Sequence, residues 1–149
     1  MTAFIPDGYC GLYCAACPQY LATKAGTTTE LGLEECQGCR SDVVAQGWCA
    51  VCTLKACARA KGVEFCYECA DYPCADLEGF KNAPDWPYHS EIYDYMATIE
   101  SQGKDAWLCQ MKTRWSCPEC GREASWWDQA CQGCGTALHG YEKPARAET

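Results

Sequence analysis

The sequence predicts a small metal-stapled α+β fold, in which short helices and irregular cysteine-rich loops are followed by a C-terminal β zinc ribbon. Three observations support this prediction. Sixteen of the 149 residues are cysteine, and most of them form Cys-x-x-Cys pairs. Only three Phe and three Met are present, so the aliphatic core is sparse and the chain needs cross-links. Two Cys-x-x-Cys-Gly sequences near the end have the spacing of a four-cysteine zinc site.

Metal ions, not disulfides, are expected to supply the cross-links. The start of the sequence has neither the basic n-region nor the apolar h-region of a secretory signal. No stretch approaches the roughly 20 apolar residues of a membrane helix. We therefore expect a cytoplasmic protein without a membrane span. Cysteines stay reduced in that compartment, where clusters of them more often bind metal than pair as disulfides.

Residues 1–80 are predicted to form a cysteine-rich multi-metal domain that contains three short helices. The helices are expected at residues 20–25, 28–35 and 53–61. The first and third are followed at once by glycine, a frequent C-terminal cap. The second has Thr and acidic residues near its start, where a helix favours them.

The same segment contains an internal repeat of a three-cysteine spacing. Residues 49–57 and 66–74 both read Cys-x2-Cys-x4-Cys, with an offset of 17 residues. Two copies of this spacing in so short a chain indicate either two similar metal loops or two halves of interleaved sites.

Residues 81–113 are predicted to be a linker followed by a helical segment. The linker is marked by two prolines. Apolar residues then recur at helical spacing after Ser90, a predicted N-cap, and Gly103 is expected to end this helix. A second helical stretch follows, with Trp107 and Met111 on one side. We expect these apolar side chains to belong to the core.

The strongest motif lies in residues 114–139 and reads Cys117-Pro-Glu-Cys120-Gly followed by Cys131-Gln-Gly-Cys134-Gly. Each Cys-x-x-Cys-Gly is expected to form a knuckle in which glycine lets backbone N–H groups point at sulfur. Four sulfur ligands make a closed and therefore structural Zn²⁺ site, because catalytic zinc keeps a position open. A rubredoxin-like iron site is the nearest alternative. Residues 140–149 are predicted to be a flexible tail.

The first cysteine motif, Cys10-x3-Cys14-x2-Cys17, allows two interpretations. Radical S-adenosylmethionine enzymes use the same spacing, but their barrel usually needs more than roughly 200 residues. A simple carrier that holds one [4Fe–4S] cluster with these three cysteines and a remote fourth is the alternative prediction. We favour zinc here, as in the other cysteine pairs.

The number of cysteines in residues 1–80 is eleven, which is not a multiple of four. Either His89 or Cys109 completes a third site, or two sites form and three thiols are spare; we favour spare thiols. We expect Cys109 to be a buried free thiol and His89 to be a capping or surface residue. Three to four Zn²⁺ ions are predicted for the whole chain. The predicted metal ligands are Cys10, Cys14, Cys17, Cys36, Cys39, Cys49, Cys52, Cys57, Cys66, Cys69, Cys74, Cys117, Cys120, Cys131 and Cys134.

The first half of the chain resembles a prokaryotic cysteine-rich family of unknown function. The resemblance covers about residues 8–80 and rests on Cys10-Gly-Leu-Tyr-Cys14-Ala-Ala-Cys17-Pro, Cys36-Gln-Gly-Cys39-Arg and the stretch from Lys61 to Cys74. The family typically opens with Cys-Gly-x-x-Cys-Gly-x-Cys-Pro, and Ala15 stands where it often has Gly. The resemblance implies metal binding, a cytoplasmic prokaryotic setting and, in some members, a continuation into a similar ribbon. It implies no reaction.

Charge narrows the choice of partner. The formal net charge is −8, and each Zn²⁺ held by four thiolates carries a further −2. Such a protein repels a phosphate backbone, so we expect a protein partner and no nucleic acid. No pair of His has zinc-hydrolase spacing, and we assign no catalytic residue. The expected function is that of a structural zinc-binding protein that acts as a protein-interaction module; the alternative is an iron–sulfur electron or cluster carrier.

Overall fold

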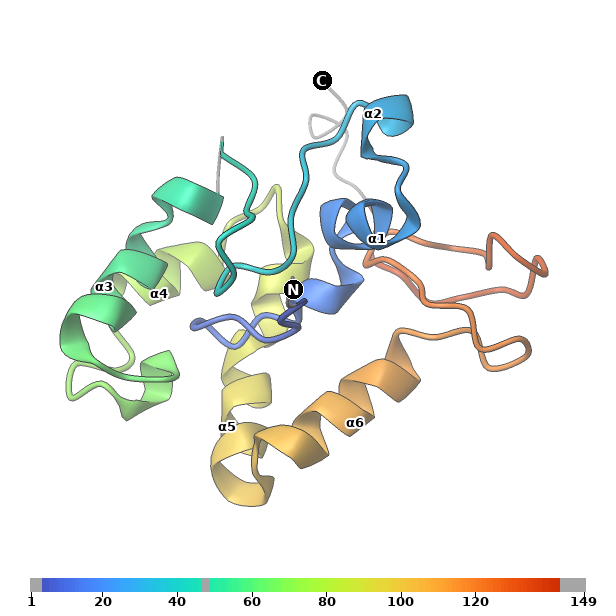
Figure 1. Ribbon diagram of the computed structural model, residues 1–149. Coiled ribbons are helices and arrows are strands. Elements are labelled where there is room, and N and C mark those ends of the chain that lie inside the picture. The colour runs from blue at the N-terminus through green and yellow to red at the C-terminus, as the bar shows by residue number, and fades with distance from the viewer. Residues whose placement is uncertain (1–3, 47–48, 143–149) are drawn as a thin grey trace.

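The computed structural model describes residues 4–46 and 49–142, and it is mostly helical (Figure 1). Short α-helices alternate with irregular loops and with 3-10 turns, which are labelled η. In chain order the elements are η1 (Cys14–Ala16), α1 (Pro18–Ala25), α2 (Thr28–Leu31), η2 (Cys49–Val51), α3 (Thr53–Lys61), η3 (Cys66–Glu68), α4 (Ala75–Lys81), η4 (Pro87–Glu91), α5 (Ile92–Gln102) and α6 (Lys104–Arg114).

Glycine ends the first and third predicted helices where the sequence indicated. Helix α1 ends before Gly26, at φ 73°, and α3 ends before Gly62, at φ 69°. Both glycines adopt the left-handed conformation that closes a helix and that other residues adopt only at a cost. Helix α1 begins earlier than predicted because Pro18 suits the first helical position, where its missing N–H is not needed.

Two predictions for the first half were wrong in extent. Helix α2 stops at Leu31 because Gly32 takes the left-handed conformation at φ 67°, so the predicted helix over 28–35 is a single turn. Helix α4 was not predicted, because Gly79 and the flanking cysteines hid its pattern. Leu77 is fully buried on this helix and anchors it to the core.

Helices α5 and α6 form the lower hairpin of Figure 1 and pack against each other. Gly103 ends α5 as predicted, and the next residue starts α6. Ser90 lies within η4, so the N-cap of α5 is Glu91. Met96 and Trp107 are fully buried, and these helices therefore supply much of the apolar material of the molecule.

The main hydrophobic cluster draws on all three predicted segments. Phe65 comes from the cysteine-rich part, Trp107 from the helical hairpin and Trp126 from the C-terminal loops. A second cluster lies between α3, α4 and α5 and contains Cys10, Leu54, Leu77, Ile92 and Met96. The predicted division at residues 80, 113 and 139 stays a prediction. The main cluster contains residues from both sides of the first two boundaries.

Regular strands do not form anywhere in residues 4–46 and 49–142, so the α+β prediction reduces to a small, mostly helical fold with cysteine-rich loops. Three isolated antiparallel bridges occur, two of which flank the C-terminal cysteine pairs: Ser116 with Glu123 and Ala130 with Ala137. Each of these two bridges encloses one knuckle and consists of a single pair of residues. Of the predicted tail, residues 140–149, the structure describes residues 140–142; residues 143–149 lie outside the described residues.

No helix in the described part of the chain combines the length and the apolar character that crossing a membrane requires.

Candidate metal centre

The four C-terminal cysteines form one compact group. The Sγ atoms of Cys117, Cys120, Cys131 and Cys134 all lie within 4.8 Å of one another. Two of these separations are 3.5 Å, from Cys117 to Cys134 and from Cys120 to Cys131. Tetrahedral zinc with bonds of about 2.3 Å to sulfur places its ligands about 3.8 Å apart. The group could therefore hold one metal ion with little movement.

Both halves of this group are built by the same backbone pattern. The N–H groups of Cys117 and Cys131 each donate to a carbonyl five residues further on, at 2.8 Å. Gly121 and Gly135 each donate an N–H to the carbonyl of the first cysteine of their pair, at 2.9 Å. Both glycines have a left-handed φ, 79° and 80°. The Cys-x-x-Cys-Gly motif thus encodes a tight turn that directs its two sulfurs to one point.

Backbone N–H groups around this turn favour thiolates. The Sγ of Cys117 accepts an N–H from Glu119 at 3.4 Å, and that of Cys131 accepts one from Gly133 at 3.3 Å. The backbone N–H of Cys120, and then that of Glu119, lower the pKa of Cys117 to about 6. Backbone N–H groups also lower the pKa of Cys131. Metal ions bind thiolates, so the loop prepares the sulfurs for a cation.

The C-terminal loops dock against the N-terminal part through Trp126. This side chain is buried and stacks on Tyr88, with ring centroids 3.8 Å apart and an interplanar angle of 13°. Its backbone N–H donates to the carbonyl of Ala16 at 3.1 Å. An exposed ion pair, from Lys24 to Glu123 at 2.9 Å, adds a weaker contact.

Five of the predicted N-terminal ligands line a cavity of about 400 Å³, together with an aromatic wall that includes Trp86, Tyr88, Trp126 and Trp127. We call it the N-terminal cavity. The cysteines come from η1 and the residue just after it, from the loop after α2 and from η2; they are Cys14, Cys17, Cys36, Cys39 and Cys49.

The thiols of this cavity interact in two pairs. The neighbouring Cys39 thiol and burial raise the pKa of Cys14, and the neighbouring Cys14 thiol lowers the pKa of Cys39 to about 7. Likewise the neighbouring Cys49 thiol lowers the pKa of Cys36 to about 6, and Cys36 raises that of Cys49. Among the described residues, no three of these sulfurs lie within 4.8 Å of one another, in contrast to the C-terminal group.

Four more predicted ligands line a smaller cavity of about 30 Å³ between α3 and α4; they are Cys57, Cys66, Cys69 and Cys74. The Lys61 ammonium donates to the Cys69 Sγ at 3.0 Å and lowers the pKa of this thiol. It also forms an exposed ion pair with Asp71 at 2.7 Å.

The internal repeat is only partly repeated in the structure. Cys49 and Cys66 both begin a 3-10 turn, but Cys57 lies within α3 whereas Cys74 precedes α4. Cys49 faces the N-terminal cavity and Cys57 faces the smaller one. Whether the repeat forms two similar metal loops or two halves of interleaved sites stays a prediction. The other two predicted ligands, Cys10 and Cys52, lie in and beside the second hydrophobic cluster.

Two expectations about additional ligands were wrong. Cys109 is exposed on α6, because Trp107 and Met111 occupy the buried face of this helix and Cys109 lies on another face. His89 is buried, at 2% exposure, between the stacked ring of Phe80 and the edge of Tyr88, and it lines the N-terminal cavity. Its Nδ1 lies 2.9 Å from the Phe80 carbonyl oxygen, which fixes Nδ1 as the protonated nitrogen of the neutral ring.

Sequence reasoning did not assign a role to two cations beside the N-terminal cavity. Arg40 follows Cys39 directly, and its Nε donates to the Asp7 carbonyl at 3.0 Å. Lys55 is buried, at 7% exposure, although it is a lysine on a helix. The signal for Lys55 was its position on the face of α3 that also carries Ala58, which is buried.

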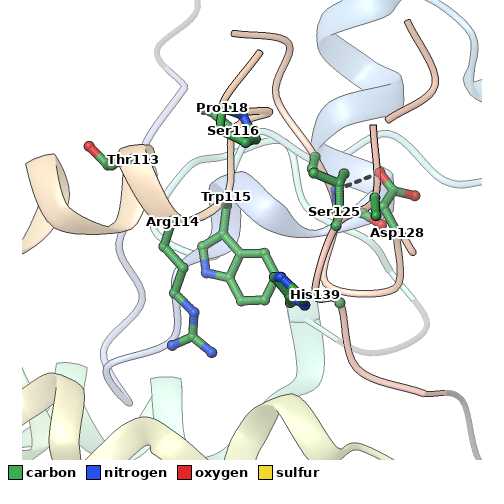
Figure 2. A pocket seen from close by; sticks show the side chains of 12 residues that line it. Thr113, Arg114, Trp115, Ser116, Pro118, Ser125, Asp128 and His139 are labelled. Atoms are coloured by element: carbon green, nitrogen blue, oxygen red, sulfur yellow. Dashed lines mark hydrogen bonds between the residues drawn. The ribbon is translucent and has the colours of Figure 1, made fainter. Parts of the chain in front are cut away.

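A third cavity, of about 400 Å³, lies where α6 meets the C-terminal loops (Figure 2). Trp115 and His139 line it, and Asp128 accepts the Ser125 backbone N–H at 2.9 Å. Arg114 forms an ion pair with Glu91, with 2.7 Å between Nη2 and Oε2. No cysteine is among the described residues that line this cavity, and we assign it neither a metal nor a reaction.

Together, the helical fold and its sulfur groups define a cysteine-rich protein with a four-cysteine cluster that could hold a metal ion. Residues 7–79, just under half of the chain, match a family described as a protein of unknown function (DUF3795). This match is consistent with the uncharacterised family that the N-terminal motifs resemble. No curated protein and no solved structure matches the chain.

Proposed function

We propose that this is a cytoplasmic structural zinc-binding protein that acts as a protein-interaction module. The observation that carries the zinc assignment is the close grouping of four Sγ atoms, all within 4.8 Å, at Cys117, Cys120, Cys131 and Cys134. Four thiolates favour zinc, and they leave no open position for a substrate or a reactive water. The single bridges that enclose the two knuckles support a minimal zinc ribbon.

The interaction role is supported by charge and by surface chemistry. A net charge of −8, made more negative by four thiolates per ion, disfavours nucleic acid and leaves another protein as the expected partner. Large apolar side chains are exposed at Leu31, Val51 and Trp86. Tyr13 and Tyr20 are buried and belong to the core, so they do not contribute to this surface.

A second candidate function is that of an iron–sulfur electron or cluster carrier. The N-terminal cavity favours it, because five cysteines surround one space of about 400 Å³. An iron–sulfur cluster is bound by cysteine thiolates and is larger than a single ion.

Metal analysis of the purified protein tests the zinc assignment. We expect Cys131→Ser to lose one zinc per chain, because it removes a ligand from a closed site. The matched control is Cys109→Ser, which removes an exposed thiol on α6 and should retain all metal. Cobalt substitution of the unmutated protein gives an independent readout, since tetrahedral tetrathiolate cobalt has intense charge-transfer bands. Zinc that is undiminished in Cys131→Ser, or cobalt without those bands, would contradict the assignment.

A cross-linked pull-down from the native host tests the interaction role. A partner recovered with the metal-loaded protein, and lost after zinc is removed, would support it. Recovery of only the proteins that also bind an unrelated acidic control would count against it.

A further inference from the structure

We infer that His89 is a metal ligand in the N-terminal cavity, where its Nε2 binds the same metal centre as thiolates of the lining cysteines. This inference rests on the metal-binding role proposed above and adds a nitrogen ligand to it. The centre is a zinc ion under the first proposed function and an iron–sulfur cluster under the second, and imidazole nitrogen is a known ligand of both.

The imidazole of His89 is held in one orientation by α4 and η4. The ring of Phe80 stacks on it, with ring centroids 3.7 Å apart and an interplanar angle of 12°. The ring of Tyr88 meets it edge-on, with centroids 4.7 Å apart at 89°. The His89 backbone N–H donates to the Trp86 carbonyl at 3.0 Å, which fixes the turn that carries the ring. A side chain that is fixed in advance loses little conformational freedom when it binds a ligand.

The hydrogen bond at Nδ1 determines which nitrogen can bind a metal. Nδ1 of His89 lies 2.9 Å from the carbonyl oxygen of Phe80. A carbonyl oxygen only accepts, so Nδ1 carries the proton of the neutral ring and Nε2 keeps its lone pair. Metal-binding histidines typically have this arrangement, in which one nitrogen binds the metal and the N–H of the other donates to a backbone carbonyl or a carboxylate.

Nε2 of His89 opens on the cavity. It has no hydrogen-bond partner among the described residues, although the side chain is only 2% exposed. The fully enclosed side-chain polar atoms that lack a partner in the described part of the chain belong to Asp7, Tyr93, Trp107 and Trp115, so Nε2 keeps some accessible surface. The space that His89 lines is the N-terminal cavity. A buried acceptor without a donor is costly, and a metal bound to its lone pair removes that cost.

The side chains around Nε2 have the chemistry of a mixed sulfur and nitrogen site. Five cysteines line the same cavity, and no carboxylate is among the described residues that do so. Thiolate and imidazole together suit zinc and iron, whereas calcium and magnesium require oxygen ligands. Nε2 and these sulfurs are less tightly grouped than the C-terminal cysteines, as far as the structure describes the chain. A zinc ion would therefore draw the thiolates toward the fixed ring, whereas a cluster spans a wider spacing by its own size.

The wall of the cavity favours a neutral ligand. Leu12, Leu33 and aromatic side chains such as Trp126 line it, so the wall solvates charge poorly. A zinc ion with four thiolates carries two negative charges, whereas one with three thiolates and an imidazole carries one. The chain itself has a net charge of −8. Replacement of one thiolate by neutral His89 therefore lowers the negative charge that the cavity has to enclose, for an ion and for a cluster alike.

The test uses full-length protein labelled with ¹⁵N at histidine, purified anaerobically and loaded either with ¹¹³Cd in place of zinc or with ferrous iron and sulfide. The chain has two histidines, so His139, which is exposed, is an internal control. In the cadmium-loaded protein we expect a scalar coupling between ¹¹³Cd and Nε2 of His89, and none to His139. In the iron-loaded protein, reduced with dithionite, we expect a ¹⁵N hyperfine coupling in pulsed EPR.

His89→Asn gives a second measurement. Asn keeps a donor for the Phe80 carbonyl but has no imidazole nitrogen, so the metal of the N-terminal cavity should bind about tenfold or more weakly. His139→Asn is the matched control and should retain all metal. The ¹¹³Cd resonance of the C-terminal group shows in each variant whether the chain is folded. If His89→Asn does not fold, the couplings in the unmutated protein decide the question alone.

The outcomes separate this inference from the function on which it rests. A coupling to Nε2 of His89 supports the inference, and the metal that produces it decides between zinc and an iron–sulfur cluster. Metal in the N-terminal cavity without a coupling to His89 would overturn the role of His89 and leave metal binding standing. If Cys131→Ser, which disables the C-terminal site, binds neither cadmium nor iron, both the inference and the metal-binding role of the cavity fail, while the C-terminal zinc assignment is unaffected.

Discussion

At the scale of single residues, a side chain's environment differs from what its type suggests. His89 is one of two histidines, and its place before a helix predicted a cap or a surface residue. It is instead enclosed by two rings and hydrogen-bonded to a backbone carbonyl. Lys55 is likewise buried where its type predicts exposure. Both depend on contacts from elements that lie elsewhere in the sequence, so local patterns could not reveal them.

Burial of His89 makes the stability of the protein depend on pH. Burial lowers the pKa of His89 from 6.5 to about 4, despite the opposing effect of the Phe80 carbonyl. The unfolded chain therefore binds a proton between these values that the folded protein excludes. The stabilising contribution is complete above pH 6.5 and is lost as the pH falls toward 4, by about 3 kcal/mol in all.

This contribution is measured by comparing chemical denaturation of the wild type and of His89→Asn from pH 7 to pH 4. Asn keeps a donor for the Phe80 carbonyl but does not titrate, so the difference between the two free energies of unfolding should shrink as the pH falls. A parallel series on chelated protein separates this contribution from the acid release of any metal bound at His89. A difference that is constant over the range would contradict the assignment.

At the scale of elements, glycine position explains which helices the sequence could predict. Gly26 and Gly62 follow α1 and α3 and mark their ends in the sequence as in the structure. In α4 a glycine lies inside the helix, where its usual meaning as a terminator misleads. A β ribbon was predicted from the spacing of the C-terminal knuckles, but one bridge per knuckle is too short for a ladder.

Two glycine substitutions should have opposite effects for this reason. An added Cβ meets nothing within 4 Å at either Gly62 or Gly79, so packing does not distinguish them. Gly62 has a φ of 69°, and Gly62→Ala should lower the free energy of unfolding by about 1 kcal/mol. Gly79 lies in the middle of α4, and Gly79→Ala should raise it by roughly 0.5–1 kcal/mol.

Urea denaturation of the two alanine variants, loaded with the same metals, measures this contrast. Equal changes of the same sign would show that the left-handed conformation at Gly62 does not limit stability.

At the scale of the whole molecule, the C-terminal cysteines were predictable and the N-terminal grouping was not. Cys117, Cys120, Cys131 and Cys134 come together because each pair sits in a short turn and only ten residues separate the pairs. In the first half, cysteines from separate turns and loops line one cavity, and the packing that brings them there cannot be predicted from the sequence. The total of eleven cysteines could be counted from the sequence, but not divided between two cavities.

The contact between the two halves predicts a large effect of Trp126→Ala. The ring is 4% exposed and stacks on Tyr88, so its removal should lower the free energy of unfolding by about 3 kcal/mol. Zinc content should remain unchanged, because Trp126 is not a ligand of the C-terminal group. Denaturation monitored together with metal analysis measures both effects, and Trp86→Ala, at a side chain 36% exposed, is the milder control. Zinc loss in Trp126→Ala would contradict the separation of docking from ligation.

The aromatic wall has a thermodynamic consequence for loading. Trp126 and Trp127 belong to the loops between the two C-terminal knuckles, yet they close one side of the N-terminal cavity. If both proposed sites bind metal, an ion that orders those loops would also change how well the N-terminal cavity is closed. Linkage makes such an effect mutual, so each site would change the affinity of the other by the same factor. Loading of one site would then depend on the supply of metal to the other.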